Sequence, residues 1–345
     1  MTIKTNLEEL DSSLPNAQSS SDLSLIAFTL ARYHLTLEAV ETLHLPPFKG
    51  SALRGGFGHL FKRLVCVQPT ACLQRCTLAN HCPYGYIFET SPPEDAGVLR
   101  NISEIPRPFI IEPPPDKKML FIPGETLTFG LTLVGRGIDY LPYFLAVFRE
   151  LGREGLGRRR GQFRLKAVEA ILPGQAAETV YRAEDEVVRT SQLQLTGETI
   201  AARAASLILS PTSNPQLTLT FLTPTRLKHQ RNWVRRGPAF QALIKVLLGR
   251  ISSLSYFHCG QPLELDFRGL IDQAAAIETT NCETHWEDWE RFSGRQKQRI
   301  ELGGLVGRVT YQGDLRPYLP FLVLGELVHV GKGAVFGNGR YRIER

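Results

Sequence analysis

The chain has 345 residues, a length that favours two domains over one. Hydrophobic residues make up 43% and charged residues 21%, which is the balance of a globular protein and excludes a chain that is disordered throughout. No apolar run approaches the ~20 residues that a transmembrane helix needs, and the N-terminus lacks the pattern of a secretory signal. We therefore expect a cytoplasmic protein without a membrane partner, and its formal net charge of +6 favours an acidic partner.

Residues 1–22 are polar and rich in serine, which predicts a disordered tail. Two α+β domains are predicted to follow, over residues 23–212 and 213–345. The apolar pattern of the first predicts strands at 25–37, 126–134 and 162–168, and helices at 52–64 and 143–151. The pattern of the second predicts strands at 216–222, at 304–311 and ending at 343, and helices at 239–254 and 320–327.

The end of each predicted domain has the same layout. A Leu-Pro pair opens a helix, and a basic, glycine-rich turn leads into a strand. The opening proline and the closing glycine, Pro142 and Gly161 or Pro320 and Gly339, are 19 residues apart both times. This similarity indicates a duplicated domain, with chance resemblance as the alternative. A unit that starts and ends with a strand and contains two βαβ halves predicts a ferredoxin-like fold.

The first domain contains a cysteine-rich insertion at about residues 66–82. Cys66, Cys72, Cys76 and Cys82 have the spacing C-x5-C-x3-C-x5-C. Thiolates this close in sequence can surround one tetrahedral ion, so we predict a structural Zn²⁺ site. An iron–sulfur cluster is the alternative, because Pro83 follows the last cysteine, and unmetallated thiols are a third possibility.

A glycine-rich segment spans residues 329–341. Its two G-x-G pairs are Gly331 with Gly333, and Gly337 with Gly339. Glycine allows backbone N–H groups to approach a ligand closely, so the segment predicts contact with phosphates. A tight helix-to-strand turn that needs small residues is the plainer interpretation.

This glycine-rich segment resembles the signature loop of the RAMP superfamily of CRISPR-associated proteins. The similarity extends to one branch, the endoribonucleases that process precursor CRISPR RNA, through the segments at 45–58, 221–228, 291–296, 303–307 and 329–341. The resemblance implies two tandem ferredoxin-like (RRM-type) domains. It also implies a partner, CRISPR repeat RNA within precursor crRNA, and possible membership of a CRISPR effector complex.

Relatives in that branch cut RNA without a metal cofactor. The ribose 2′-hydroxyl attacks the adjacent phosphate and leaves a 2′,3′-cyclic phosphate. This chemistry needs a base, an acid and a cation near the phosphate, and histidine suits the first two roles. The resemblance favours His329, then His59, then His81, with Lys332 and Lys49 as the cations.

The expected RNA contacts are the four loop glycines and six arginines from three basic stretches, Arg340, Arg158, Arg159, Arg160, Arg235 and Arg236. A second reading keeps the fold and the RNA but drops the catalysis: a RAMP subunit that binds guide RNA in an effector complex. A metal-dependent nuclease is a third, and it lacks a visible carboxylate cluster.

Overall fold

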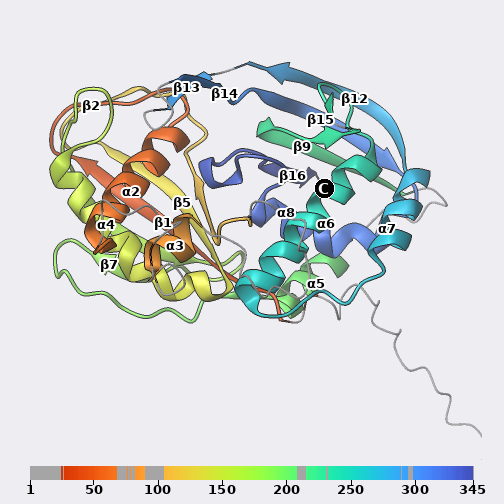
Figure 1. The fold of residues 1–345 in the computed structure, drawn as a ribbon, viewed down its shortest axis with the longest axis horizontal. Helices are drawn as coiled ribbons and strands as arrows, with labels where there is room; N and C mark the ends of the chain where they lie inside the picture. The colour runs from red at the N-terminus through yellow and green to blue at the C-terminus, as the bar shows by residue number, and fades with distance from the viewer. Residues whose placement is uncertain are drawn as a thin grey trace, which may run out of the picture.

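In a computed structural model, residues 27–67, 82–89, 105–207, 215–230, 232–288, 290–293 and 298–344 are described, with the single positions 25, 76 and 78. Two α+β halves lie side by side (Figure 1), the first coloured red to lime and the second green to blue. The predicted N-terminal tail and the predicted domain boundary near residue 212 lie outside the described residues. No described helix is long and apolar enough to span a membrane.

The first half is an antiparallel sheet covered by two helices. Its strands are ordered β3-β5-β1-β6, and β7 adds an edge strand next to β6. The bounds in chain order are β1 (Thr29–Ala39), α2 (Gly50–Val65), β3 (Phe109–Glu112), β5 (Thr126–Val134), α4 (Leu141–Glu154), β6 (Phe163–Ile171) and β7 (Glu178–Arg182). Without β7, this is the β-α-β-β-α-β succession of a ferredoxin-like unit.

The second half repeats that succession. Its sheet has the order β12-β15-β9-β16, which matches β3-β5-β1-β6 strand for strand. The bounds are β9 (Gln216–Thr225), α6 (Phe240–Leu254), β12 (Glu278–Glu287), β15 (Gly304–Gln312), α8 (Leu319–Val328) and β16 (Tyr341–Glu344). The mixed α+β class predicted from the sequence is confirmed, and the shared strand order supports the predicted repeat.

Shorter elements complete the chain. They are β2 (Leu43–His44), α3 (Pro83–Phe88), β4 (Leu120–Phe121), β8 (Leu195–Thr196), α5 (Gly197–Ala205), β10 (Lys228–His229), β11 (Asn232–Trp233), α7 (Phe267–Gln273), β13 (Glu290–Ser293) and β14 (Gln298–Glu301). α5 packs on α8 of the second half, and Arg203 pairs with Glu326 there at 2.8 Å.

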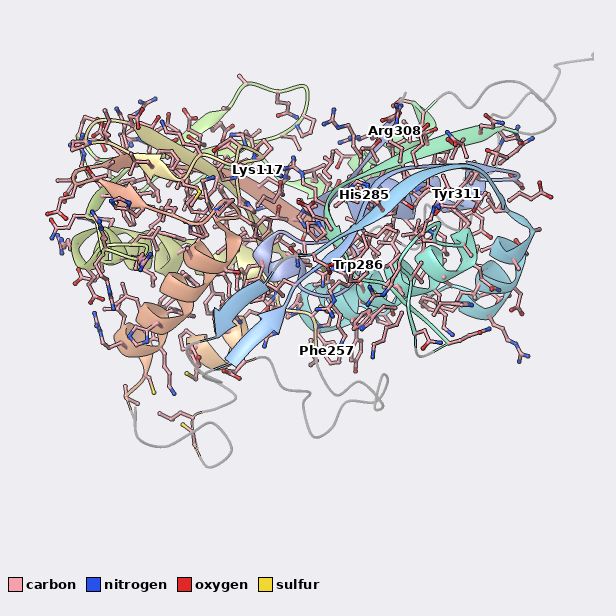
Figure 2. All side chains as sticks on the ribbon, turned by 90° about the horizontal axis from the view of Figure 1, so that it is seen from above. Lys117, Phe257, His285, Trp286, Arg308 and Tyr311 are labelled. Carbon is pink, nitrogen blue, oxygen red and sulfur yellow. The ribbon has the colours of Figure 1, made fainter. Side chains whose placement is uncertain are left out.

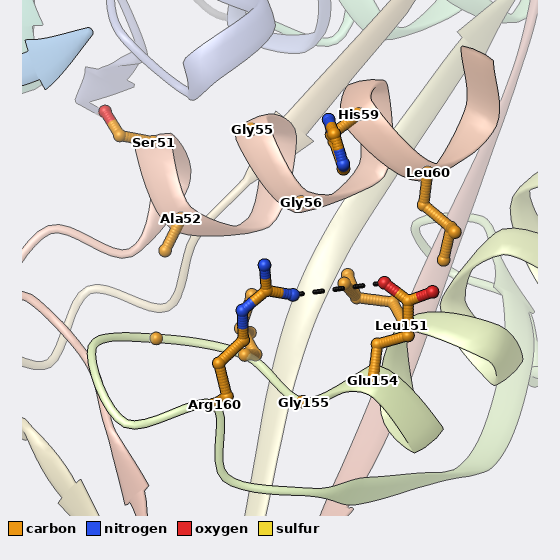
Figure 3. Close-up of a pocket in the computed structure, with 12 residues that line it drawn as sticks. Ser51, Ala52, Gly55, Gly56, His59, Leu60, Leu151, Glu154, Gly155 and Arg160 are labelled. Atoms are coloured by element: carbon orange, nitrogen blue, oxygen red, sulfur yellow. Dashed lines mark ion pairs between the residues drawn. The ribbon is translucent and has the colours of Figure 1, made fainter. Parts of the chain in front are cut away.

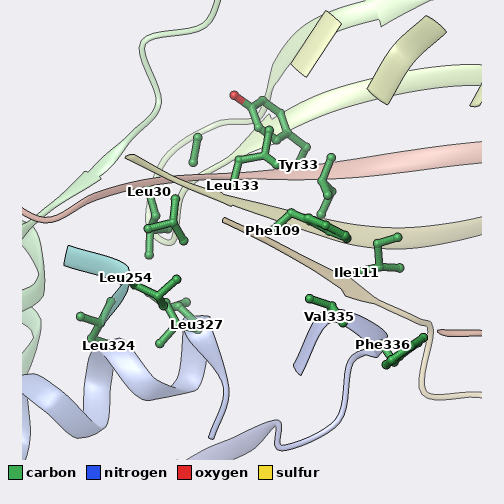
Figure 4. Packing of buried hydrophobic residues seen from close by; sticks show 14 of the residues in the cluster. Leu30, Tyr33, Phe109, Ile111, Leu133, Leu254, Leu324, Leu327, Val335 and Phe336 are labelled. Atoms are coloured by element: carbon green, nitrogen blue, oxygen red, sulfur yellow. The ribbon is translucent and has the colours of Figure 1, made fainter. Parts of the chain in front are cut away.

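Both α4 and α8 begin at the predicted Leu-Pro pairs. Proline fits there because backbone N–H groups in the first turn of a helix have no partner within the helix. The two helices are buried differently. α4 keeps an exposed face that includes Tyr143, Ala146 and Arg153, whereas nearly every residue of α8 is buried between the second sheet, α5 and α6. A short 3₁₀ turn after α8, η7 (Ala334–Phe336), leaves the second half and packs on β3 of the first. There Val335 and Phe336 lie beside Phe109 and Ile111 (Figure 4) and join the two cores.

Candidate functional site

The two glycine-rich turns hold equivalent positions in the two halves. The first turn is residues 155–161 and the second turn is residues 329–339. The backbone N–H of Arg158 donates to the His44 carbonyl at 3.2 Å, and that of Lys332 donates to the Arg226 carbonyl at 3.2 Å. Each acceptor lies between the first strand and the first helix of its own half. The turns therefore share the same backbone grip, as expected for duplicated units.

The first turn borders a pocket of about 330 Å³ between itself and α2 (Figure 3). His59 projects from α2 as an exposed side chain, and Arg160 faces it from the turn. Glu154, at the end of α4, pairs with Arg160 at 3.9 Å and also with Arg63. An imidazole and a guanidinium thus line one pocket that is open to solvent.

The helix α2, which forms one wall of the pocket, contains two residues that lower helix stability. Gly55 and Gly56 are consecutive in α2, and each costs a helix interior about 1 kcal/mol relative to alanine. A Cβ on Gly56 would lie 2.9 Å from the Leu151 side chain of α4, whereas nothing lies within 4 Å of a Cβ on Gly55. The aromatic rings of Phe57 and Phe144 stack 4.3 Å apart and hold α2 on α4. The pocket therefore lies beside two helices that are joined by stacked aromatic rings.

The second turn is mostly sealed. Its residues 334–339 are buried, and Lys332 is the exposed tip between the half-buried Gly331 and Gly333. The four glycines all have positive φ. A Cβ on Gly337 would lie 2.3 Å from Pro113 Cδ, and one on Gly339 would lie 1.8 Å from the Val330 carbonyl oxygen. Close packing against the chain itself accounts for these glycines, and their predicted contact with RNA stays a prediction.

His329, ranked first among the catalytic candidates, is fully buried at the end of α8. Its Nδ1 forms a 3.0 Å hydrogen bond with the Asn338 carbonyl, and its Nε2 lies 4.0 Å from Glu112 Oε1. Burial lowers the pKa of His329 to about 4, so the ring is neutral at physiological pH. These contacts fix the second turn and leave no path for a phosphodiester to reach the ring.

Lys49 is also fully buried, at the start of α2. Its ammonium donates to the Asp116 carboxylate at 3.1 Å and to the Asp116 and Pro47 carbonyls at 2.8 and 3.3 Å. These contacts use all three donors of the ammonium group to hold a loop. By contrast, Lys332, Arg158, Arg159, Arg235 and Arg236 are exposed, as phosphate contacts require.

A buried carboxylate that the sequence reading missed joins the halves. Glu112 on β3 is 4% exposed and accepts hydrogen bonds from Arg32 Nη2 at 3.0 and 3.1 Å. Thr132 donates to it at 3.1 Å, and Arg340 from the second half lies 3.7 Å away. Burial alone raises the pKa of Glu112, but the neighbouring positive charges and the Thr132 hydroxyl outweigh it and hold the pKa below its ordinary value. Because His329 is neutral at pH 7, the two arginines provide this charge.

The predicted metal site is only partly described. Cys66, Cys76 and Cys82 are half-buried, whereas Cys72 lies outside the described residues, as does the candidate His81. Among the described side chains, no group of three or more His, Cys, Asp or Glu is arranged to hold a metal ion. Zinc or an iron–sulfur cluster therefore stays a prediction, to be checked by the metal content of the purified protein.

Comparison with known proteins finds a matching family model for each half. Residues 219–341 match the model of the CRISPR-associated endoribonuclease Cas6, and residues 28–193 match AF_1859_N, an N-terminal domain family. The match of this half to the Cas6 model confirms, over those residues, the resemblance seen in the sequence. An uncharacterized protein of Archaeoglobus fulgidus is 25% identical over 304 residues, which cover 87% of this chain and 93% of that protein.

Two solved structures share the fold over 92% of this chain. One is a chain of a partial Cas6-RT-Cas1–Cas2 complex, with a TM-score of 0.55 and 14% identity, and the match covers 46% of that chain. The present chain therefore spans about half of its length. The other is a Cas6 product complex, with a TM-score of 0.51, 16% identity and 99% of that chain covered. At these identities the similarity establishes the fold.

Proposed function

We propose that the protein is an endoribonuclease that cleaves CRISPR repeat RNA in precursor transcripts to yield guide RNAs. The observation that carries this proposal is the pocket in which His59 faces Arg160, in a chain whose second half matches the Cas6 family. The 2′-oxygen forms a bond to phosphorus while the bond from phosphorus to the 5′-oxygen breaks. The products are a 2′,3′-cyclic phosphate and a 5′-hydroxyl, and no metal takes part.

His59 is the proposed base that removes the proton from the 2′-hydroxyl, because it is the exposed histidine of the pocket. Arg160 is the cation that balances the charge developing on phosphate, and exchanging its long 3.9 Å contact with Glu154 for a phosphate requires little rearrangement. His81 is the candidate acid that donates a proton to the departing 5′-oxygen. We rank His59 above His329 because His329 is enclosed on all sides.

The test is cleavage of the protein's own repeat RNA in EDTA. We expect His59→Ala to slow cleavage by about 10²–10⁴-fold while RNA binding stays near normal, since general acid–base catalysis contributes that much. His285→Ala is the matched control, because His285 is an exposed histidine on β12 outside the pocket. RNA with a 2′-deoxyribose before the cut should bind and remain intact.

Two results would contradict the proposal at different levels. If His59→Ala cleaves at the wild-type rate, the role of His59 is wrong and the pocket has another use. If wild-type protein binds repeat RNA and never cuts it, the protein is a non-catalytic RAMP subunit. The sealed second turn favours that alternative, because it buries the histidine that the family resemblance ranked first.

The proposed partners are repeat RNA and a CRISPR protein complex. The similarity of fold to a chain of the Cas6-RT-Cas1–Cas2 complex supports the second partner. Copurification of CRISPR-associated proteins with the tagged chain tests it.

A further inference from the structure

Two tryptophans in the second half are each stacked with cations. Trp233 lies on the short β10–β11 hairpin, directly opposite Lys228. The Arg226 guanidinium is 4.3 Å from the Trp233 ring centroid, and the Lys228 ammonium is 4.8 Å from it. On β12, Trp286 has the Arg235 guanidinium 4.9 Å from its centroid. We name these five residues the tryptophan surface.

The chain joins the two stacks into one surface. The backbone N–H of Gly237 donates to Thr284 Oγ1 at 3.0 Å, so the segment that carries Arg235 runs along β12. At the other end, the Arg226 carbonyl accepts from Lys332, the exposed tip of the second turn. Trp286 lies near the middle of the molecule (Figure 2), and its neighbour Glu287 contacts Lys117 of the first half at 3.7 Å. The surface thus extends from the second turn toward the first half.

The cations of this surface have different partners from those of the basic residues on β6 and β15. Arg164 and Lys166 on β6 share the one carboxylate of Glu38, and Arg308 on β15 pairs with Glu344. Among the described residues, neither Lys228 nor Arg235 pairs with a carboxylate, and their partners are aromatic rings. An indole attracts a cation without cancelling its charge, so Lys228 and Arg235 keep their positive charge beside the two half-exposed rings. The indole N–H of Trp286 donates to the Asp288 carboxylate at 2.6 Å, which places one negative charge at the edge of that ring.

We propose that Trp233 and Trp286 form a stacking surface for unpaired bases of RNA, with Lys228 and Arg235 holding the adjacent phosphates. Successive aromatic rings beside cations are the arrangement that binds single-stranded nucleic acid, because each base offers a free face. Bases inside a duplex have both faces covered, so the ligand is a single-stranded segment beside a stem. The choice of RNA as ligand rests on the proposed function.

The test measures binding without cleavage. A short single-stranded RNA and a blunt-ended RNA hairpin, both with 2′-deoxyribose before the cut, are titrated at several salt concentrations. We expect Trp233→Ala and Trp286→Ala each to weaken single-strand binding about 5–160-fold, with an unchanged salt slope and little effect on the hairpin, since stacking is worth ~1–3 kcal/mol per base. Lys228→Ala should weaken binding and also flatten the salt slope, because it removes a phosphate contact.

Phenylalanine at either position should bind the single strand more tightly than alanine, because its ring can still stack on a base. A tryptophan with a purely structural role gives no reason to expect this recovery. Arg308→Ala is the control, since Glu344 already neutralises that arginine. Thermal unfolding identifies variants that lose affinity by unfolding. For those, quenching of wild-type tryptophan fluorescence by the single strand decides, and an absence of quenching overturns the inference. Folded tryptophan variants with wild-type affinity would also overturn it and leave the proposed nuclease intact, whereas wild-type protein that binds neither RNA refutes both.

Discussion

The two glycine-rich turns show how duplicated units diverge. Each begins after a helix opened by proline and grips the segment that follows the first strand of its half. The same span is divided differently: α4 has 14 residues and α8 has 10, so the second turn is longer. The extra length forms η7, which crosses to β3, while the first turn stays outside and exposes Arg158, Arg159 and Arg160. One turn became the wall of a pocket, and the other became the joint between the halves.

The carboxylates beside these turns differ in the same way. Near the first turn, Glu38 forms ion pairs with Arg164 at 2.6 Å and with Lys166 at 2.8 Å, and both cations are substantially exposed. Glu112 takes Arg32 and Arg340 where the second turn meets the first sheet, and it is almost fully buried. Exposed pairs are screened by water and contribute little, whereas a buried pair cannot lose one member without leaving a buried charge. This contrast predicts very different costs for the same substitution.

The largest expected effect is therefore that of Glu112→Ala. It leaves Arg32 and Arg340 without their buried carboxylate, and we expect a loss of about 3–5 kcal/mol in the free energy of unfolding. Glu38→Ala is the matched control, with an expected loss of ~1 kcal/mol or less. Urea unfolding at pH 7.5 measures both. Equal losses of unfolding free energy would show that buried Glu112 contributes no more stability than exposed Glu38.

The glycines offer the next test. Gly337 and Gly174 both have positive φ, at 90° and 82°. A Cβ on Gly337 would meet Pro113 Cδ at 2.3 Å, whereas no atom lies within 4 Å of a Cβ on Gly174. Gly174→Ala should therefore cost only the backbone strain, ~1–2 kcal/mol. Gly337→Ala should cost about 3 kcal/mol, because η7 must also shift away from β3. Thermal unfolding compares the two variants. If they have the same melting temperature, η7 moves away from β3 without a loss of stability.

Sequence reasoning reached the class of the fold because its long strands and helices carry clear periodicity. The predicted strand at 126–134 matches β5, and the predicted helix at 239–254 begins one residue before α6. It missed β3, which has four residues inside a proline-rich stretch, and β12, whose side chains are mostly exposed and show no apolar alternation. Such strands are defined by their partners in the sheet, which local sequence does not encode.

The site was harder to predict for the same reason. Glu112 and Arg32 are 80 positions apart, and no local pattern links them. His329 lies in a glycine-rich segment that suggests exposure, yet it is fully buried beside the Asn338 carbonyl and Glu112 of β3. The signal that could have been used is the pair of glycines in α2, since Gly55 and Gly56 weaken a helix and lie one turn from His59.

The buried histidine of the second turn should make the stability of the protein depend on pH. The pKa of His329 is lowered by burial to about 4, whereas an unfolded histidine has a pKa near 6.5. The unfolded chain therefore binds a proton that the folded chain refuses. The stability that His329 contributes is complete above about pH 6.5 and declines as the pH falls toward 4.

Between pH 7.5 and pH 5.0 we expect this histidine alone to cost about 2 kcal/mol of unfolding free energy, since one pKa unit corresponds to 1.36 kcal/mol. His258 behaves similarly, because burial beside Tyr86 and Pro106 also lowers its pKa to about 4. His329→Gln removes one of these contributions, so its unfolding free energy should fall less on acidification than that of wild-type protein. If the unfolding free energy of His329→Gln falls as steeply as that of wild-type protein, the ring of His329 reaches solvent in the folded protein, and its exclusion from catalysis would have to be withdrawn.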